Sequence, residues 1–211
     1  MTTITHHPGE ETLASFAAGT LDEPRSVVVA AHIALCPHCR ATVAAFEQLG
    51  GALVERVPPA VSRTGALDEA LARLDEAAPP APVMLQAASG CPDVLAPYEV
   101  GRWRWIGPGV HWRRVEVPES EGTRVFMLKA APGSSLPHHG HSGVEWTCVL
   151  QGAFRHDLGR YGPGDFDEAD SSVDHTPFVE EGDVCICLVA MQGNLELRGW
   201  LGKLMQPFVR L

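Results

Sequence analysis

The chain has 211 residues, of which 45% are hydrophobic and 20% are charged, and its formal net charge is −10. This balance is typical of a globular protein and excludes a disordered one. Residues 1–78 carry 5 basic and 10 acidic side chains, and residues 79–211 carry 11 and 16. Neither part has the basic surface that direct binding of nucleic acid requires, so a protein partner or a small ligand fits better.

No stretch of the sequence reaches the roughly 20 apolar residues of a membrane-spanning helix. The first ten residues, MTTITHHPGE, lack the basic and apolar regions of a secretory signal. We therefore expect a cytoplasmic protein that does not enter a membrane. Because disulfides are rare in that compartment, the six cysteines need another explanation.

Caps, prolines and apolar spacing predict four helices within residues 1–76. Asp22 is placed to cap the second helix. The third is expected to begin near Pro37 and to stop at Gly50-Gly51. Apolar residues from Leu67 to Leu74 recur with the spacing i, i+3, i+4, i+7, which predicts the fourth.

The segment AAPPAPVMLQAASGCP, residues 77–92, has the composition of a linker, since its three clustered prolines prevent a continuing helix. After it the pattern changes to short strands separated by Gly and Pro turns, such as VHWRRVEV, TRVFMLKA and DVCICLVA. Many short strands indicate a small barrel or sandwich. The predicted organisation is a helical domain at 1–76, a linker at 77–92 and an all-β domain at 93–211.

The spacing His32-x3-Cys36-x2-Cys39 indicates a zinc site in the helical part. The proline between the cysteines can open a helix, which places Cys36 at the cap and Cys39 one turn in, where the helix N-terminus favours thiolates. A fourth ligand must come from elsewhere, and His6 and His7 are the nearest histidines. A redox-active Cys-x2-Cys pair would need a preceding strand, which the pattern lacks.

A second group of potential ligands lies in the all-β part. His139, His141 and Glu145 have the same strand parity, so we expect them on one strand with their side chains on one side. His175, from a neighbouring strand, is the expected fourth ligand. Three imidazoles and one carboxylate suit zinc, iron, manganese or nickel.

The remaining histidines and cysteines give weaker signals. His138 is expected at the rim of the second group. Cys185 and Cys187 share a strand face, and they are either buried packing residues or a redox-active pair. Cys91 and Cys148 belong to no motif, and we expect them to be a linker thiol and a packing residue.

The spacing of His7, His32, Cys36 and Cys39 within a four-helix module resembles the zinc-binding anti-sigma domain of bacteria, over roughly residues 1–76. His7 rather than His6 matches by spacing. In that family the helices clamp a group IV (extracytoplasmic-function, ECF) sigma factor and cover its surfaces for RNA polymerase. The resemblance therefore implies a zinc site and a sigma-factor partner.

The pattern Gly133-x5-His139-x-His141-x3-Glu145-x6-Gly152 resembles the first cupin motif, and the segment from Tyr161 to His175 resembles the second with a longer gap. The order of the two modules resembles the ChrR family, as do the stretches VLQGAFR, HTP, CICL and LMQPFVRL. This resemblance implies an α plus all-β two-domain fold, with an N-terminal zinc-binding anti-sigma domain, a C-terminal cupin β-barrel, and zinc at both sites.

By the same resemblance the chain is expected to be an anti-sigma factor and not an enzyme. Its N-terminal domain would sequester the sigma factor and bind it even without residues 93–211. The cupin domain would detect oxidative chemistry, such as singlet oxygen or organic hydroperoxides, and trigger release. The alternative is a metal-dependent cupin dioxygenase with an accessory zinc module, which would hold iron and show oxygen-dependent turnover.

Overall fold

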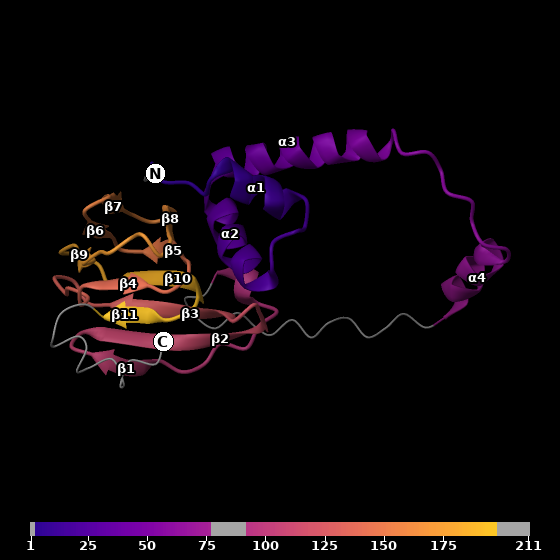
Figure 1. The fold of residues 1–211 in the computed structure, drawn as a ribbon. Coiled ribbons are helices and arrows are strands. Elements are labelled where there is room, and N and C mark those ends of the chain that lie inside the picture. Colours follow the sequence, from indigo (N-terminus) through magenta and orange to yellow (C-terminus); the bar gives the residue numbers. More distant parts are fainter. Residues whose placement is uncertain (1–2, 77–91, 198–211) are drawn as a thin grey trace.

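The computed structural model describes residues 3–76 and 92–197 (Figure 1). The helices of this part are α1 (Glu10–Ala17), α2 (Glu23–Leu35), α3 (Pro37–Val54), α4 (Ala66–Ala72) and the 3-10 turns η1 (Arg73–Asp75) and η2 (Asp93–Leu95). The strands are β1 (Arg104–Gly107), β2 (Val110–Ser120), β3 (Thr123–Ala130), β4 (His139–His141), β5 (Glu145–Gln151), β6 (Phe154–His156), β7 (Gly159–Tyr161), β8 (Phe166–Ala169), β9 (Phe178–Val179), β10 (Cys185–Gln192) and β11 (Leu195–Leu197).

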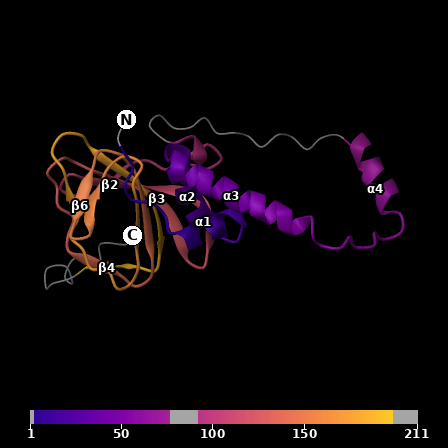
Figure 2. The ribbon, with the colours of Figure 1, turned by 90° about the horizontal axis from the view of Figure 1, so that it is seen from above.

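The strands form the predicted antiparallel barrel, which is seen from above in Figure 2. One sheet has the order β1-β2-β3-β10-β5-β8, and shorter sheets have the orders β11-β4 and β7-β6-β9. The longer predicted strands are all found within the described residues. The short strands β6, β7 and β9 were not predicted, because two or three residues are too few to show an alternating pattern. Strand β4 was expected only as part of one longer strand from His139 to Glu145.

The predicted helices are present in the structure, but one of them, α3, ends later than predicted. The Asp22 carboxylate accepts a hydrogen bond from the backbone N–H of Arg25 at 2.9 Å, which confirms the predicted cap of α2. The predicted stop of α3 at Gly50-Gly51 is wrong, since the helix continues to Val54. Neither glycine adopts the positive φ of a helix-ending residue. A glycine inside a helix costs only about 1 kcal/mol, which the long α3 tolerates.

Helix α2 joins the helical and all-β parts. It packs against β2, β3, β5 and β10 of the large sheet. Its buried side chains and those of the sheet form one apolar cluster, which includes Val28 and Val29 of α2 and Met127 and Leu188 of the sheet. The two parts therefore share a hydrophobic core. The boundaries predicted from the sequence stay predictions, and residues 77–91 of the predicted linker lie outside the described residues.

Polar contacts hold α2 in the same place. The guanidinium of Arg25 donates a hydrogen bond to Gln192 on β10 at 2.9 Å and lies 5.5 Å from the ring centre of Trp146 on β5. The Tyr98 hydroxyl donates to the Glu23 carboxylate at 2.8 Å. The position of α2 on the sheet is thus fixed by polar contacts at its first turn as well as by packing along its apolar face.

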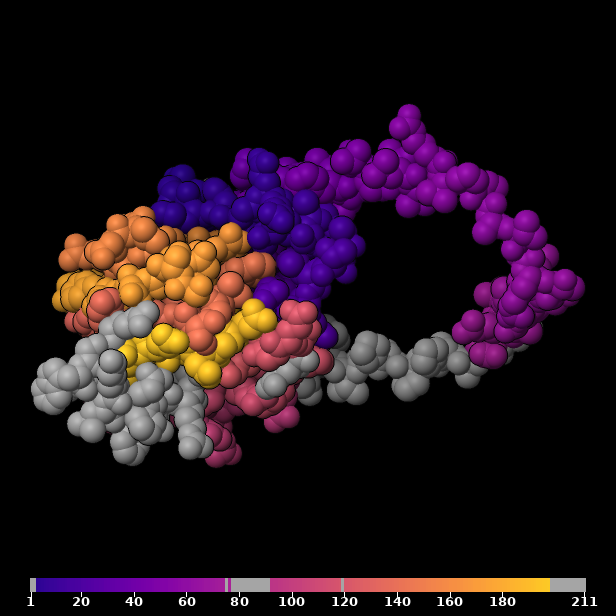
Figure 3. All heavy atoms as spheres, viewed as in Figure 1, coloured from indigo at the N-terminus to yellow at the C-terminus, as the bar shows by residue number. Residues whose placement is uncertain are grey.

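Helix α4 stands apart from the rest of the chain (Figures 1 and 3). None of its residues is buried. The apolar side chains that predicted this helix are found on it, yet Leu67 is 70% exposed and Leu71 is 52% exposed. Apolar residues near the end of α3 are exposed as well, such as Val54 at 71%.

None of the helices in residues 3–76 and 92–197 is long and apolar enough to cross a membrane by itself. Helices α2 and α3 meet the length and composition criteria only together, as a pair bent by 118°.

The shared core predicts the effect of trimming α2. Val28 is fully buried, so Val28→Ala should lower the free energy of unfolding by about 1.5–3 kcal/mol in a denaturant titration. Val61→Ala is the matched control, because Val61 is 99% exposed, and it should change stability by less than about 0.5 kcal/mol. A Val28→Ala chain that unfolds in two steps, with the barrel transition unchanged, would contradict the shared core.

Candidate metal centres

Four predicted ligands of the helical part meet in space. Single donor atoms of His7, His32, Cys36 and Cys39 all lie within 4.8 Å of one another. Nδ1 of His7 is 3.5 Å from Sγ of Cys36 and 3.4 Å from Sγ of Cys39. A tetrahedral zinc with bonds of ~2.3 Å to sulfur and ~2.0 Å to nitrogen separates such atoms by about 3.5 Å. The donor set therefore fits a zinc ion in both chemistry and spacing.

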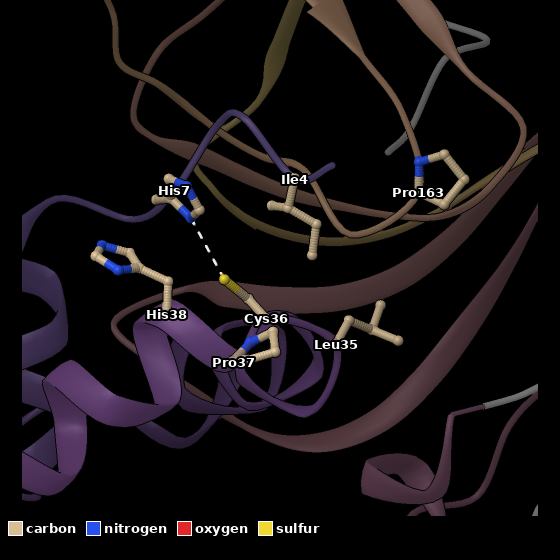
Figure 4. Close-up of a pocket in the computed structure, with 7 residues that line it drawn as sticks. All are labelled: Ile4, His7, Leu35, Cys36, Pro37, His38 and Pro163. Atoms are coloured by element: carbon tan, nitrogen blue, oxygen red, sulfur yellow. Dashed lines mark hydrogen bonds between the residues drawn. The ribbon is translucent and has the colours of Figure 1, made fainter. Parts of the chain in front are cut away.

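Three segments bring these donors together, and Figure 4 shows two of the donors, His7 and Cys36. Cys36 caps α3 and Cys39 lies in its first turn, as the sequence predicted. His32 lies in the last turn of α2. His7 comes from the N-terminal arm, residues 4–7, which runs between the α2–α3 corner and the turn of the barrel that contains Pro163.

His32 is oriented by the barrel. Its Nδ1 lies 2.7 Å from the carbonyl oxygen of Gly164. A carbonyl only accepts hydrogen bonds, so Nδ1 carries the proton and Nε2 presents a lone pair. That Nε2 is buried without a hydrogen-bond partner, as a metal-binding nitrogen would be. Burial lowers the pKa of His32 to about 4, so the ring is neutral and able to bind a cation at neutral pH.

Cys39 needs a cation nearby to become a thiolate. Burial, and next the neighbouring Cys36, raise the pKa of Cys39 to about 12. The helix N-terminus alone therefore does not deprotonate Cys39. A bound dication supplies the missing positive charge and releases the thiol protons.

His6 and His7 have different surroundings. His7 belongs to the donor group, whereas the ring of His6 packs against Tyr161 with 4.3 Å between ring centres. His38 is exposed, with its ring 5.3 Å from that of His7. Of the two histidines that the sequence left open, His7 is the one that the structure brings to the cysteines.

Three of the four predicted ligands of the barrel also converge. Nε2 of His175 lies 3.0 Å from Nε2 of His139 and 3.3 Å from Nε2 of His141, and all three side chains are buried. Two nitrogens bound to one metal at ~2.1 Å lie about 3.0 Å apart at a right angle and about 3.4 Å apart at the tetrahedral angle. The spacing fits a metal but does not select one.

These three imidazoles are neutral, and the lone pairs of their converging nitrogens compete for the same proton. Burial, and next His139, lower the pKa of His175 to about 3, and burial lowers the pKa of His139 and of His141. His139 uses its Nδ1 proton on the carbonyl of Pro137 at 2.7 Å, so its Nε2 is an acceptor. A single N–H of His175 cannot satisfy both neighbours. A cation between the three nitrogens would satisfy them together.

The predicted position of Glu145 is wrong in one respect. Strand β4 ends at His141 and β5 begins at Glu145, so the two histidines and the carboxylate do not share one strand. A turn between the strands removes the parity on which the prediction relied. Oε2 of Glu145 lies 3.7 Å from Nδ1 of His141, on the other side of that ring from the nitrogen that faces His175. Glu145 is therefore beside the three converging nitrogens and not among them.

Sequence reasoning missed two polar residues of the same interior. His156 on β6 and Asp167 on β8 form a further group of donor atoms with His175, all within 4.8 Å of one another. Nε2 of His156 lies 3.2 Å from Oδ2 of Asp167. Both residues lie on strands of three or four residues and have no motif spacing, so the sequence carried no signal for them.

The other cysteines lie in the packed wall of the barrel. Cys185 and Cys187 are buried, and their sulfur atoms are 3.8 Å apart, on one side of β10. A hydrogen bond with Cys185, and next burial, raise the pKa of Cys187 well above its usual range. Cys187 therefore stays a thiol, the less reactive form. Cys148 is buried as expected, His138 is exposed at the rim, and Cys91 lies outside the described residues.

Comparisons with known proteins agree with this arrangement. The family model described as the ChrR Cupin-like domain matches residues 92–194. The anti-sigma-E factor ChrR of Cereibacter sphaeroides is 41% identical over 215 residues, covering 99% of this chain and all of that protein.

Two solved structures differ greatly in their similarity. The crystal structure of Rhodobacter sphaeroides SigE in complex with the anti-sigma ChrR matches 90% of this chain and all of that chain, with 38% identity and a TM-score of 0.76. An acetylacetone dioxygenase from Acinetobacter johnsonii matches 46% of this chain and 68% of its own, with 17% identity and a TM-score of 0.40, a level that says nothing about function. The chain belongs to the ChrR family of helical and cupin-like two-part proteins.

Proposed function

We propose that the chain is an anti-sigma factor that sequesters a group IV (ECF) sigma factor. The observation that carries this proposal is similarity over the full length to the anti-sigma-E factor ChrR, together with the match to ChrR in complex with SigE. This makes the chain a regulator rather than an enzyme, so the alternative of a cupin dioxygenase is not retained. No charge pattern of the chain favours nucleic acid as a direct partner. The cytoplasm, where sigma factors act, is the proposed location.

We propose zinc as the metal of the helical part. The set of two imidazoles and two cysteines provides four donors and leaves no open position, which is typical of structural zinc. Such an ion contributes folding free energy to the segments that supply its ligands, here the arm, α2 and α3.

The barrel is proposed to hold a second metal through His139, His141 and His175, with Glu145 as fourth ligand after a rotation of its side chain or of the His141 ring. Zinc fits, and iron, manganese or nickel also bind such donors. The signal proposed for this part is oxidative, as with singlet oxygen or organic hydroperoxides. Its support is a buried set of imidazoles and thiols, which are oxidisable groups.

The sigma factor is proposed to bind the exposed apolar residues at the end of α3 and on α4. This apolar surface consists of Leu49, Leu53, Val54, Val57, Leu67, Leu71 and Leu74, each between 52% and 78% exposed. Helices shorter than about 12 residues are marginal in water unless packing supports them. Helix α4 has seven residues and none is buried, so a partner that covers Leu67 and Leu71 would supply the missing support.

Metal content distinguishes the two proposed sites. The purified full-length chain should hold two metal ions per chain by mass spectrometry of the metals. Cys36→Ala/Cys39→Ala should hold one, and His139→Ala/His141→Ala should hold the other, because each pair removes two donors of one group. Cys148→Ala, a buried cysteine outside both groups, should retain two ions. Full metal content in either double variant would contradict the site that it removes.

Loss of the zinc in the helical part should also weaken sigma binding, because that ion holds the helices in place. In a pull-down with the cognate sigma factor, Cys36→Ala/Cys39→Ala should capture at least about tenfold less sigma factor than the unmodified chain. Unchanged capture by the metal-free variant would show that the ion does not organise the binding surface.

The apolar surface can be tested without disturbing the core. Leu71→Asp should weaken binding of the cognate sigma factor by at least about tenfold in a titration followed by calorimetry, because it places a charge in an apolar interface. Its thermal unfolding should not change, since Leu71 is 52% exposed. Leu158→Asp is the control, because Leu158 is 61% exposed on the far side of the barrel, and it should bind normally. Equal affinities of the two variants would exclude α4 from the interface.

A further inference from the structure

A continuous series of aromatic rings runs from the N-terminal arm to the metal group of the barrel. The ring of His6 lies 4.3 Å from the ring of Tyr161, measured between centres. Tyr161 stacks on His156 at 4.9 Å, and His156 lies 4.8 Å from His175. His6 is the chain neighbour of His7, and His175 is the barrel histidine on which the others converge. The series therefore runs from the chain neighbour of one proposed ligand, His7, to another proposed ligand, His175.

The backbone follows the same route. Oδ1 of Asp165 accepts hydrogen bonds from the backbone N–H groups of Thr5 at 2.6 Å and of His6 at 2.9 Å. The N–H of Phe166 donates to the carbonyl of His6 at 3.1 Å. Asp167, one residue further along β8, faces His156 in the barrel interior. The first residue of β8, Phe166, thus contacts the arm, and the second, Asp167, contacts His156, which neighbours the metal group of the barrel.

Side chains of the arm lie directly against two glycines of the barrel. A Cβ on Gly164 would lie 2.5 Å from Cδ1 of Ile4, and a Cβ on Gly159 would lie 3.1 Å from Nε2 of His6. Both glycines have positive φ, at 91° and 154°. The contact therefore leaves little room for the arm to shift independently of the strands around Tyr161.

Tyr161 is the ring of the series that connects the arm to the histidines inside the barrel. Its side chain is buried, with 4% exposure, and it contacts His6 on one side and His156 on the other. If His175 or His156 moves, Tyr161 must repack, because buried rings fill their space and cannot be displaced into a void. Repacking of Tyr161 shifts the surface against which the His6 ring packs. His7 then moves as well, because it is the next residue in the chain.

We infer that Tyr161 is the positioning residue that couples the two metal centres, so that a change at the barrel metal is transmitted through Tyr161 and His6 to the bond between His7 and the zinc. The inference rests on the proposed function, since it requires metal at both sites. It assigns no chemistry to Tyr161 itself. The coupling is a free energy between two binding sites, and typical values correspond to factors of about 5 to 150 in affinity or rate.

The test uses the full-length chain loaded with Co²⁺. Cobalt bound to Cys36 and Cys39 gives a thiolate charge-transfer absorption, and the barrel group contains no thiolate. The rate at which EDTA abolishes this absorption reports on the site in the helical part alone. We expect His175→Ala, which weakens the barrel centre, to speed the loss at least about fivefold. In a Tyr161→Leu chain the same His175→Ala change should alter the rate less than about twofold, because the connection is absent.

Three further variants separate the ring contact from general damage. Tyr161→Phe keeps the ring and should keep the fivefold effect of His175→Ala. Phe126→Leu removes an equally buried ring of the same apolar cluster that lies outside the series, and it should also keep the effect. His6→Ala changes a partly exposed side chain and should abolish the effect of His175→Ala without weakening the core. This variant replaces Tyr161→Leu in the test if Tyr161→Leu fails to fold.

Three results would count against the inference, and each has a different cause. An undiminished effect of His175→Ala in the Tyr161→Leu or His6→Ala chain would overturn the inference and leave both metal sites standing. Loss of the effect in Phe126→Leu would overturn it as well, because the effect would then reflect barrel stability. If the unmodified chain never develops the thiolate absorption, the proposed zinc site itself is wrong, and the inference falls with it.

Discussion

The hydrogen bond between Nδ1 of His32 and the carbonyl of Gly164, 2.7 Å long and buried, is the contact on which the arrangement of the helical part depends. It fixes the tautomer of the ring and turns Nε2 towards the cysteines, as outer hydrogen bonds do for many metal-binding histidines. The acceptor belongs to the barrel and the donor to α2. The orientation of His32 towards the cysteines therefore depends on α2 lying on the barrel, so the barrel orients a candidate ligand of the helical part.

The shared core gives that contact its stability. The apolar face of α2 buries Val27, Val28 and Val29 against the large sheet, and Asp165 anchors the arm with charge-assisted hydrogen bonds. Although burial raises the pKa of the Asp165 carboxyl, its backbone donors lower it more, so the charge persists near neutral pH. Removing residues 93–211 would expose the α2 face and free His32 Nδ1. An isolated helical part should therefore hold its zinc less firmly than the full chain does.

The sequence predicted ligands better than it predicted their surroundings. Ligand spacing is local, so the sequence grouped His32, Cys36 and Cys39, and the structure brings them together at the α2–α3 corner. The barrel was predicted from strands long enough to alternate. His156 and Asp167 were missed because pairing between short strands, which no local pattern encodes, brings them to His175. The separation of Glu145 from β4 depended on a turn that parity cannot foresee. The shared core was also invisible, because an apolar helix face does not say which surface covers it.

Coupling through the arm must be reciprocal. If the barrel metal changes the hold of His7 on the zinc, the zinc changes the affinity of the barrel for its metal by the same factor. The same holds one step further, because Cys36 caps α3, whose other end carries part of the apolar surface proposed for the sigma factor. A bound sigma factor that orders α3 would thus stabilise the zinc group, the arm and the barrel metal together. The chain is therefore most resistant to its signal while the complex is intact. The weakest contact in the series of rings, rather than the strongest metal site, sets the threshold for release of the sigma factor.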